Sequence, residues 1–379
     1  MGRCHDSVGM SRIPWFVWVS LASVSCIVAG TYWDISWHMS IGRDSFWTPA
    51  HLAIQAGGIL AGVAGATLIF STTFRRTAPL RPVSIGVWGF RGPFGAFLGA
   101  WGAATMVVSA PFDNWWHNAY GLDVKILSPP HAVLTLGILG VAIAGVLLVL
   151  ATMNRASGQA RDRLARVLLV IGGEILVLSM IAILEHTFRS NLHRADAYRS
   201  VAAVAPLIMI ALARVSAQRW AATILATFYT VFMAAMVWLF PLFAAEPKLG
   251  PVYQQITHFI PLEFPLMLIA PAIAIDLVRG RLAAWPRWKL APMLGATFLV
   301  VFVAAEWPFA AFMQTPAAGN AVFGGDYFAY FMQPSWAIPR HEFFPEDALA
   351  SGMVEALVLA IATSWIGLRL GDAMRSVRR

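Results

Sequence analysis

Residues 131–153 read HAVLTLGILGVAIAGVLLVLATM, and this run without a single Asp, Glu, Lys or Arg decides the fold. About 20 consecutive apolar residues are enough to cross the hydrocarbon core of a bilayer. Hydrophobic residues make up 59% of the chain and charged residues only 12%, about half the charged share of soluble proteins. We therefore predict an all-α fold, a polytopic integral membrane helical bundle with about ten transmembrane helices. The spans are expected at 13–33, 48–73, 94–113, 131–153, 164–187, 200–216, 220–243, 256–278, 290–312 and 350–370.

The positive charges predict how the bundle is oriented. Most of the 27 Lys and Arg residues fall at alternate ends of the apolar runs and in the two tails, as at Arg75, Arg76, Arg279 and Arg281. By the positive-inside rule these ends, with the N- and C-termini, are cytoplasmic. The net charge of +8 then reflects topology and contact with the anionic lipid bilayer, and we expect no nucleic acid partner.

The opposite side of the membrane is expected to hold the polar chemistry, because all nine histidines except His5 fall there. Four of these histidines belong to a motif that occurs twice. An Asp and a His four residues apart share one face of a helix, and the second His arrives from the start of the next helix. The two copies are Asp34-x3-His38-x12-His51 and Asp113-x3-His117-x13-His131.

Each copy of the motif offers two imidazoles and one carboxylate, a ligand set that suits Cu(II), zinc, iron or manganese. Neither Cys nor Met takes part in the pattern, which disfavours a soft thiolate site. Between the two histidines of each copy lies a Gly-x-Asp, and we expect Asp44 and Asp123 to accept a hydrogen bond from a ligand imidazole as second-shell residues. Alternatively, an interfacial His is often only a satisfied, partly hydrated residue, and the Trp beside it anchors the helix at the membrane interface. The repetition of the motif favours metal binding.

The rest of the chain predicts a division into two parts. Residues 1–155 form two repeated metal-binding helical hairpins, and residues 156–379 supply six further transmembrane helices with an outer loop at about 313–349. Together they make a single membrane domain. Glu174 lies near the middle of an expected span, where it is a candidate proton relay or polar contact between helices. For His186, His193 and His258, loop packing or salt bridges are expected rather than metal binding.

At residues 30–150 the chain resembles the C subunit of the copper membrane monooxygenases, the particulate methane and ammonia monooxygenase family. The match lies in the two spacings, their order, and flanking residues such as Trp37-His38 and Arg43-Asp44-Ser45-Phe46. The family pattern has Asn where this chain has Asp113, and the six C-terminal helices have no match in that subunit. The resemblance implies one or two copper ions, one held by Asp34, His38 and His51 and the other by Asp113, His117 and His131.

Three functions fit these features. The resemblance implies an oxidoreductase, a copper-dependent monooxygenase or its metal-bearing subunit, which oxidises a small apolar substrate with O2. It would work at the periplasmic side of a bacterial inner or intracytoplasmic membrane, with other monooxygenase subunits or as a homo-oligomer. The second function is copper or zinc binding and transport at the periplasmic face. The third is a metal-free membrane scaffold, in which the Asp–His pairs are hydrogen-bonded polar contacts.

Overall fold

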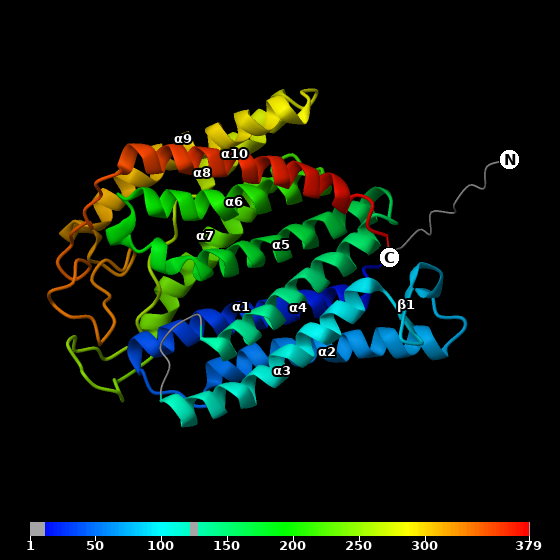
Figure 1. Cartoon of the computed structure of the whole chain (residues 1–379), viewed down its shortest axis with the longest axis horizontal. Helices are drawn as coiled ribbons and strands as arrows, with labels where there is room; N and C mark the ends of the chain where they lie inside the picture. Colours follow the sequence, from blue (N-terminus) through cyan, green and yellow to red (C-terminus); the bar gives the residue numbers. More distant parts are fainter. Residues whose placement is uncertain (1–11, 122–127, 379) are drawn as a thin grey trace. The chain divides into compact units, whose positions relative to one another are not determined.

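The computed structural model describes residues 12–121 and 128–378 and is mainly helical, with very little strand (Figure 1). One short antiparallel hairpin pairs Ile85 with Gly92 and Val87 with Phe90 through a two-residue turn. The α-helices are α1 (Trp15–Ser40), α2 (Pro49–Phe74), α3 (Phe94–Tyr120), α4 (Pro129–Met153), α5 (Gly158–Ala182), α6 (Ala195–Ser216), α7 (Ala221–Leu239), α8 (Ile269–Arg281), α9 (Arg287–Met313) and α10 (Leu349–Met374). The strands are β1 (Ile85–Val87) and β2 (Phe90–Gly92), and the 3-10 helices are η1 (Arg81–Val83), η2 (Leu184–His186), η3 (Arg189–Asn191), η4 (Phe240–Leu242) and η5 (Pro316–Ala318).

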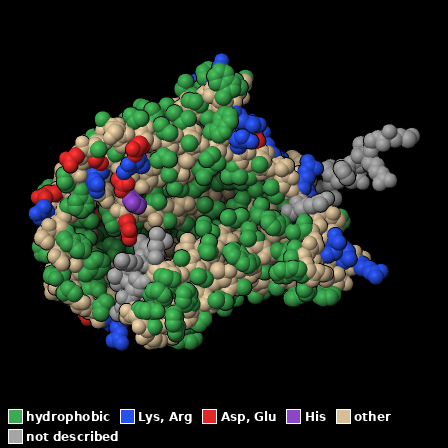
Figure 2. Space-filling view, viewed as in Figure 1, with side chains coloured by type: hydrophobic (Ala, Val, Ile, Leu, Met, Phe, Trp, Pro, Cys, Tyr) green, Lys and Arg blue, Asp and Glu red, His purple; other side chains and the backbone are tan. Residues whose placement is uncertain are grey.

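Within the described residues, nine helices are long and apolar enough to cross a membrane, all except α8. Their outward faces keep large apolar side chains exposed, among them Val63, Leu136 and Val300. Figure 2 shows the same character on the face in view, where hydrophobic side chains predominate and charged ones are few. Broad exposed apolar surfaces of this kind fit lipid contact rather than water. The predicted all-α polytopic bundle is therefore confirmed.

The expected span at 256–278 is not one continuous helix. Only α8 is helical there, and residues 259–266 before it belong to neither a helix nor a strand. Pro261 and Pro265 explain the difference, because proline lacks a backbone N–H and disfavours helical geometry in the residue before it. Even so, Ile260, Leu262 and Leu266 are buried. The apolar run is a buried non-helical segment followed by a helix too short to span a bilayer.

The described chain forms two compact units. The first contains residues 12–31, 45–171 and 374–378, and the second contains residues 32–44 and 172–373. In the first unit α3 packs against both α2 and α4. In the second unit α6 to α9 pack together around large buried side chains such as Tyr198, Phe298 and Phe302.

Small residues allow the close crossing of α3 and α4 in the first unit. A Cβ atom built on Gly102 would lie 2.8 Å from the carbonyl oxygen of Gly137 and 2.8 Å from the backbone nitrogen of Val141. A Cβ on Gly137 would lie 2.9 Å from the carbonyl oxygen of Gly102. The two backbones are thus in direct contact, as in membrane helix pairs built on small residues.

Replacing Gly102 by Ala tests this crossing. We expect Gly102→Ala to lower the stability of the purified protein by about 1–3 kcal/mol, because backbone atoms have to move apart to make room for the methyl group. Thermal unfolding in detergent measures the effect. Gly280→Ala in α8 is the matched control, since nothing lies within 4 Å of its added Cβ. An equal or smaller loss in Gly102→Ala than in Gly280→Ala would contradict the tight crossing.

Candidate metal centre

The first motif is positioned by the last two turns of α1 and the turn after it. Asp34 and His38 are one helical turn apart, and Oδ2 of Asp34 lies 3.9 Å from Nε2 of His38. The same nitrogen lies 3.5 Å from Oδ2 of Asp44. The imidazole therefore sits within ion-pair distance of two carboxylates. All three side chains are in the second unit and are partly exposed, His38 the most at 32%.

Gly42 makes the turn that brings Asp44 back to His38. Its φ of +81° is a left-handed conformation that favours glycine, and a Cβ there would come within 2.0 Å of the Tyr330 hydroxyl. The helix closes just before it, because the backbone N–H groups of Ile41 and Gly42 both donate to the Trp37 carbonyl. The backbone conformation and the nearby Tyr330 side chain therefore explain why the Gly-x-Asp of the motif begins with glycine. The turn places the Asp44 carboxylate beside the His38 imidazole.

His51 is positioned by the first turn of α2, in the first unit. Its Nδ1 lies 2.9 Å from the carbonyl oxygen of Ser45, and Ser45 N–H donates to the Thr48 hydroxyl just before the helix. A carbonyl oxygen only accepts, so Nδ1 is the donor, and in a neutral imidazole Nε2 is then the nitrogen with the lone pair. Histidines that bind metals commonly hold their other ring nitrogen in this way.

In the second motif, the described carboxylate–imidazole pair joins two helices. Oδ1 of Asp113 on α3 lies 3.8 Å from Nε2 of His131 on α4. Ser128 caps α4 and accepts a hydrogen bond from the His131 N–H at 3.4 Å. The cap fixes the first turn of α4, from which the imidazole projects. The side chain of His117 and all of Asp123 lie outside the described residues.

The turn after the second motif's helix repeats the first. Gly121 has a φ of +89° and follows His117 by four residues, just as Gly42 follows His38. Both copies of the motif therefore end their helix at a left-handed glycine. The repeat seen in the sequence is thus also a repeat of backbone geometry.

The donor chemistry of both copies fits a borderline or hard divalent metal, because each presents imidazole nitrogen beside carboxylate oxygen on a partly exposed surface. Across the described parts of the chain, no group of three or more His, Cys, Asp and Glu side chains is arranged to hold a metal ion. What the structure brings together is one carboxylate–imidazole pair at each motif, with Asp44 added to the first.

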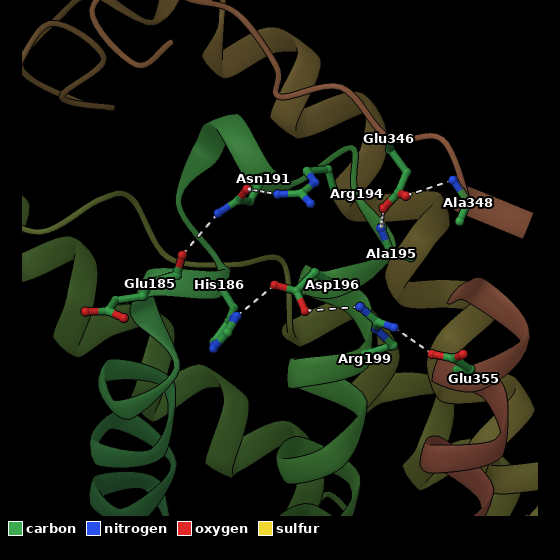
Figure 3. A network of polar contacts seen from close by, with 10 residues as sticks. All are labelled: Glu185, His186, Asn191, Arg194, Ala195, Asp196, Arg199, Glu346, Ala348 and Glu355. Atoms are coloured by element: carbon green, nitrogen blue, oxygen red, sulfur yellow. Dashed lines mark hydrogen bonds and ion pairs between the residues drawn. The ribbon is translucent and has the colours of Figure 1, made fainter. Parts of the chain in front are cut away.

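Histidines outside the motifs have protein partners. His186 joins a chain of contacts in which Asp196 accepts from its Nδ1 at 2.7 Å and Arg199 links Asp196 to Glu355 (Figure 3). The His193 ring is stacked between Trp307 and Phe343, with centroid distances of 4.1 and 3.7 Å. These contacts match the salt bridges and loop packing expected for His186 and His193.

Within the second unit, the same network connects the loop before α10 to the start of α6. In Figure 3 the Glu346 carboxylate accepts hydrogen bonds from the backbone N–H groups of Ala348 and Ala195. These hydrogen bonds, the one from Ala348 first, lower the pKa of Glu346 below its usual value. The carboxylate is therefore charged at neutral pH and holds the start of α10 against the start of α6.

Sequence reasoning missed one polar group of the second unit. Arg189 is 3% exposed; its guanidinium and backbone N–H donate to the two carboxylate oxygens of Glu263, at 3.2 and 2.6 Å. Glu306 lies 1% exposed on α9. Glu174, the candidate relay, is also buried, at 2% exposed on α5. The sequence does contain a signal for the Glu263 site. Glu263 lies between Pro261 and Pro265, and two prolines so close together indicate that this stretch is not helical.

No family model, no curated protein and no solved structure matches the chain.

The two turn glycines provide a test of the first motif's geometry. Gly42→Ala should be destabilising through both backbone strain, about 1–2 kcal/mol, and the clash with Tyr330. Gly121→Ala should cost only the strain, since no described atom lies within 4 Å of its added Cβ. Thermal unfolding of both variants measures the difference, and Gly42→Ala/Tyr330→Phe should recover part of the stability that Gly42→Ala loses. Equal losses for the two glycines, or no recovery in the double variant, would contradict the contact.

Proposed function

We propose that the chain is a copper-binding, monooxygenase-like membrane protein, or the metal-bearing subunit of one, that oxidises a small apolar substrate with O2. The observation that carries the proposal is the repeated motif, which yields a carboxylate–imidazole pair at both places. The spacing resemblance to the copper membrane monooxygenases supplies the metal and the reaction class. In the same proposal, the metal sites and the reaction lie at the periplasmic side of a bacterial membrane.

In this proposal the residues of the first motif have distinct roles. Asp34 and His38 offer an oxygen and a nitrogen donor one helical turn apart, and His51 offers Nε2 because its Nδ1 is held by Ser45. Asp44 orients the His38 ring and adds negative charge that favours a cation. Bound copper would supply the redox chemistry with O2.

The second motif offers Asp113 and His131 from two helices, with His117 as its third proposed ligand. The broad apolar faces of the surrounding helices provide a lipid-side route for an apolar substrate. Partner subunits or further copies of the chain would complete the enzyme.

One observation favours the second candidate, copper or zinc transport. The second unit contains a buried non-helical segment, residues 259–266, and broken membrane helices are typical of transporters. In that function the motifs would capture the ion at the membrane surface and pass it on. The two candidates share the metal site and differ in whether O2 is consumed.

Metal content per chain tests the shared site. Protein purified from copper-replete membranes should hold copper, and His38→Ala/His117→Ala should lose about one ion per altered motif, because each loses an imidazole ligand. His186→Ala is the matched control, since it removes an imidazole that pairs with Asp196 outside the motifs. Copper retained in the double variant, or absent from the wild type, would contradict the proposal. Zinc instead of copper would favour transport, and oxygen-dependent oxidation of small alkanes, alkenes or ammonia would favour the enzyme.

The role of Asp44 gives a graded test of the first motif. Asp44→Asn keeps the shape of the side chain but removes its charge, so copper affinity at this motif should fall by about 10- to 100-fold without loss of the site. Asp34→Asn removes a proposed ligand and should cost more. Competitive titration with a copper chelator measures both. If Asp44→Asn costs more than Asp34→Asn, the assignment of ligand and supporting carboxylate is reversed.

A further inference from the structure

The buried non-helical segment of the second unit satisfies its backbone through side chains of neighbouring helices. The N–H of Ile260 donates to the Ser40 hydroxyl at 2.7 Å, and the N–H of Leu262 donates to the Tyr32 hydroxyl at 2.9 Å. Further along, Leu266 N–H donates to the Tyr229 hydroxyl at 3.1 Å. Non-helical backbone in an apolar region needs such partners. Three of the segment's partners are neutral hydroxyl groups.

The fourth partner is an acid. Met267 N–H donates to Oε2 of Glu306 at 2.7 Å, and this carboxyl group is 1% exposed. Glu306 lies seven residues before the end of α9, so about 10 Å inside the helix terminus. A hydroxyl would satisfy Met267 as well as a carboxyl does, while an ionised carboxylate is costly in this position. The presence of an acid here therefore calls for a reason other than capping the segment.

No positive charge compensates Glu306. In the described part of the chain, no Lys, Arg or His nitrogen lies within 4 Å of its carboxyl oxygens. The buried cation of this region, Arg189, is committed to Glu263, to the Gly325 carbonyl at 2.5 Å and to the face of Phe328. The titratable groups that face Glu306 are Tyr198 from α6, Tyr229 from α7 and Glu263 from the non-helical segment. Burial without a nearby cation favours the neutral, protonated form of a carboxylic acid.

A small cavity is lined by two of the groups that face Glu306, namely Tyr229 and Glu263. Its volume is about 20 Å³, enough for one water molecule. Thr187, Tyr229 and Glu263 supply its polar lining, and Leu184 is among the apolar residues around them. Tyr229 connects the cavity with the acid, because its side chain lines the cavity and also lies within electrostatic range of Glu306.

We propose that Glu306 is a proton-binding site in the interior of the second unit, which exchanges its proton through the water-sized cavity beside Glu263 and Tyr229. The proton is the ligand, and Met267 N–H holds the carboxyl group in place in either state. Loss of the proton places a second negative charge near Glu263, the ion-pair partner of Arg189. Arg189 also donates to the Gly325 carbonyl in the long loop between α9 and α10. A change in the protonation state of Glu306 therefore affects the position of this loop. This proposal is independent of metal binding.

Infrared spectroscopy of the full chain in lipid nanodiscs tests the site. The carbonyl stretch of a protonated carboxylic acid is separate from the carboxylate bands, and it shifts when H2O is replaced by D2O. We expect such a band at neutral pH, its loss in Glu306→Gln, and its retention at a shifted frequency in Glu306→Asp. Glu355→Gln is the matched control and should keep the band, because Glu355 is exposed and paired with Arg199. A wild-type spectrum without the band, or a Glu306→Gln spectrum that keeps it in full, would overturn the proposal.

The exchange route has its own test. Leu184→Phe fills the cavity while leaving Glu306 intact, so the band should remain and its D2O shift should become several-fold slower. An unchanged exchange rate would show that the proton does not pass through this cavity. Sodium chloride at fixed pH, with choline chloride as control, should leave the band unchanged. Loss of the band with sodium alone would assign the site to a monovalent cation and overturn the assignment to a proton.

Discussion

Every backbone N–H and C=O group in an apolar surrounding needs a partner inside the protein, because hydrocarbon offers none. Helices such as α4 meet this requirement within themselves, which is why an uninterrupted apolar run is enough to specify them. The non-helical segment before α8 cannot do so, and it takes its partners from Ser40, Tyr32, Tyr229 and Glu306. The same constraint therefore explains both the long helices and the placement of polar side chains in the interior of the second unit.

The constraint relaxes at the ends of the helices, and the metal-ligating residue types gather there. The last turns of α1 and the first turn of α2 leave backbone groups that caps and turns satisfy, as the Ser45–Thr48 contact and the left-handed Gly42 do. Partly exposed Asp and His side chains can be accommodated in such turns at little cost. The motif is thus built from ordinary helix termination, with ionisable side chains at the positions that the turn already fixes.

The sequence predicts the parts of the structure that depend on local geometry. Nine spans follow from apolar runs, and the Asp34–His38 contact follows from their separation by one helical turn. The prediction of a continuous span at 256–278 is wrong because an apolar run does not distinguish a buried non-helical segment from a helix. Contacts between distant residues, such as Arg189 with Glu263 and Met267 with Glu306, depend on how helices pack and leave no periodic signal. The metal identity and the reaction still depend on the family resemblance.

The two copies of the motif also differ in what holds them together. In the first, the helix itself sets the distance between Asp34 and His38, so the pair persists as long as α1 remains helical there. In the second, Asp113 and His131 belong to different helices, and their distance depends on the crossing of α3 and α4. That crossing relies on backbone contact at Gly102 and Gly137. Packing in the middle of the first unit therefore controls the distance between Asp113 and His131, while the last turns of α1 control the distance between Asp34 and His38.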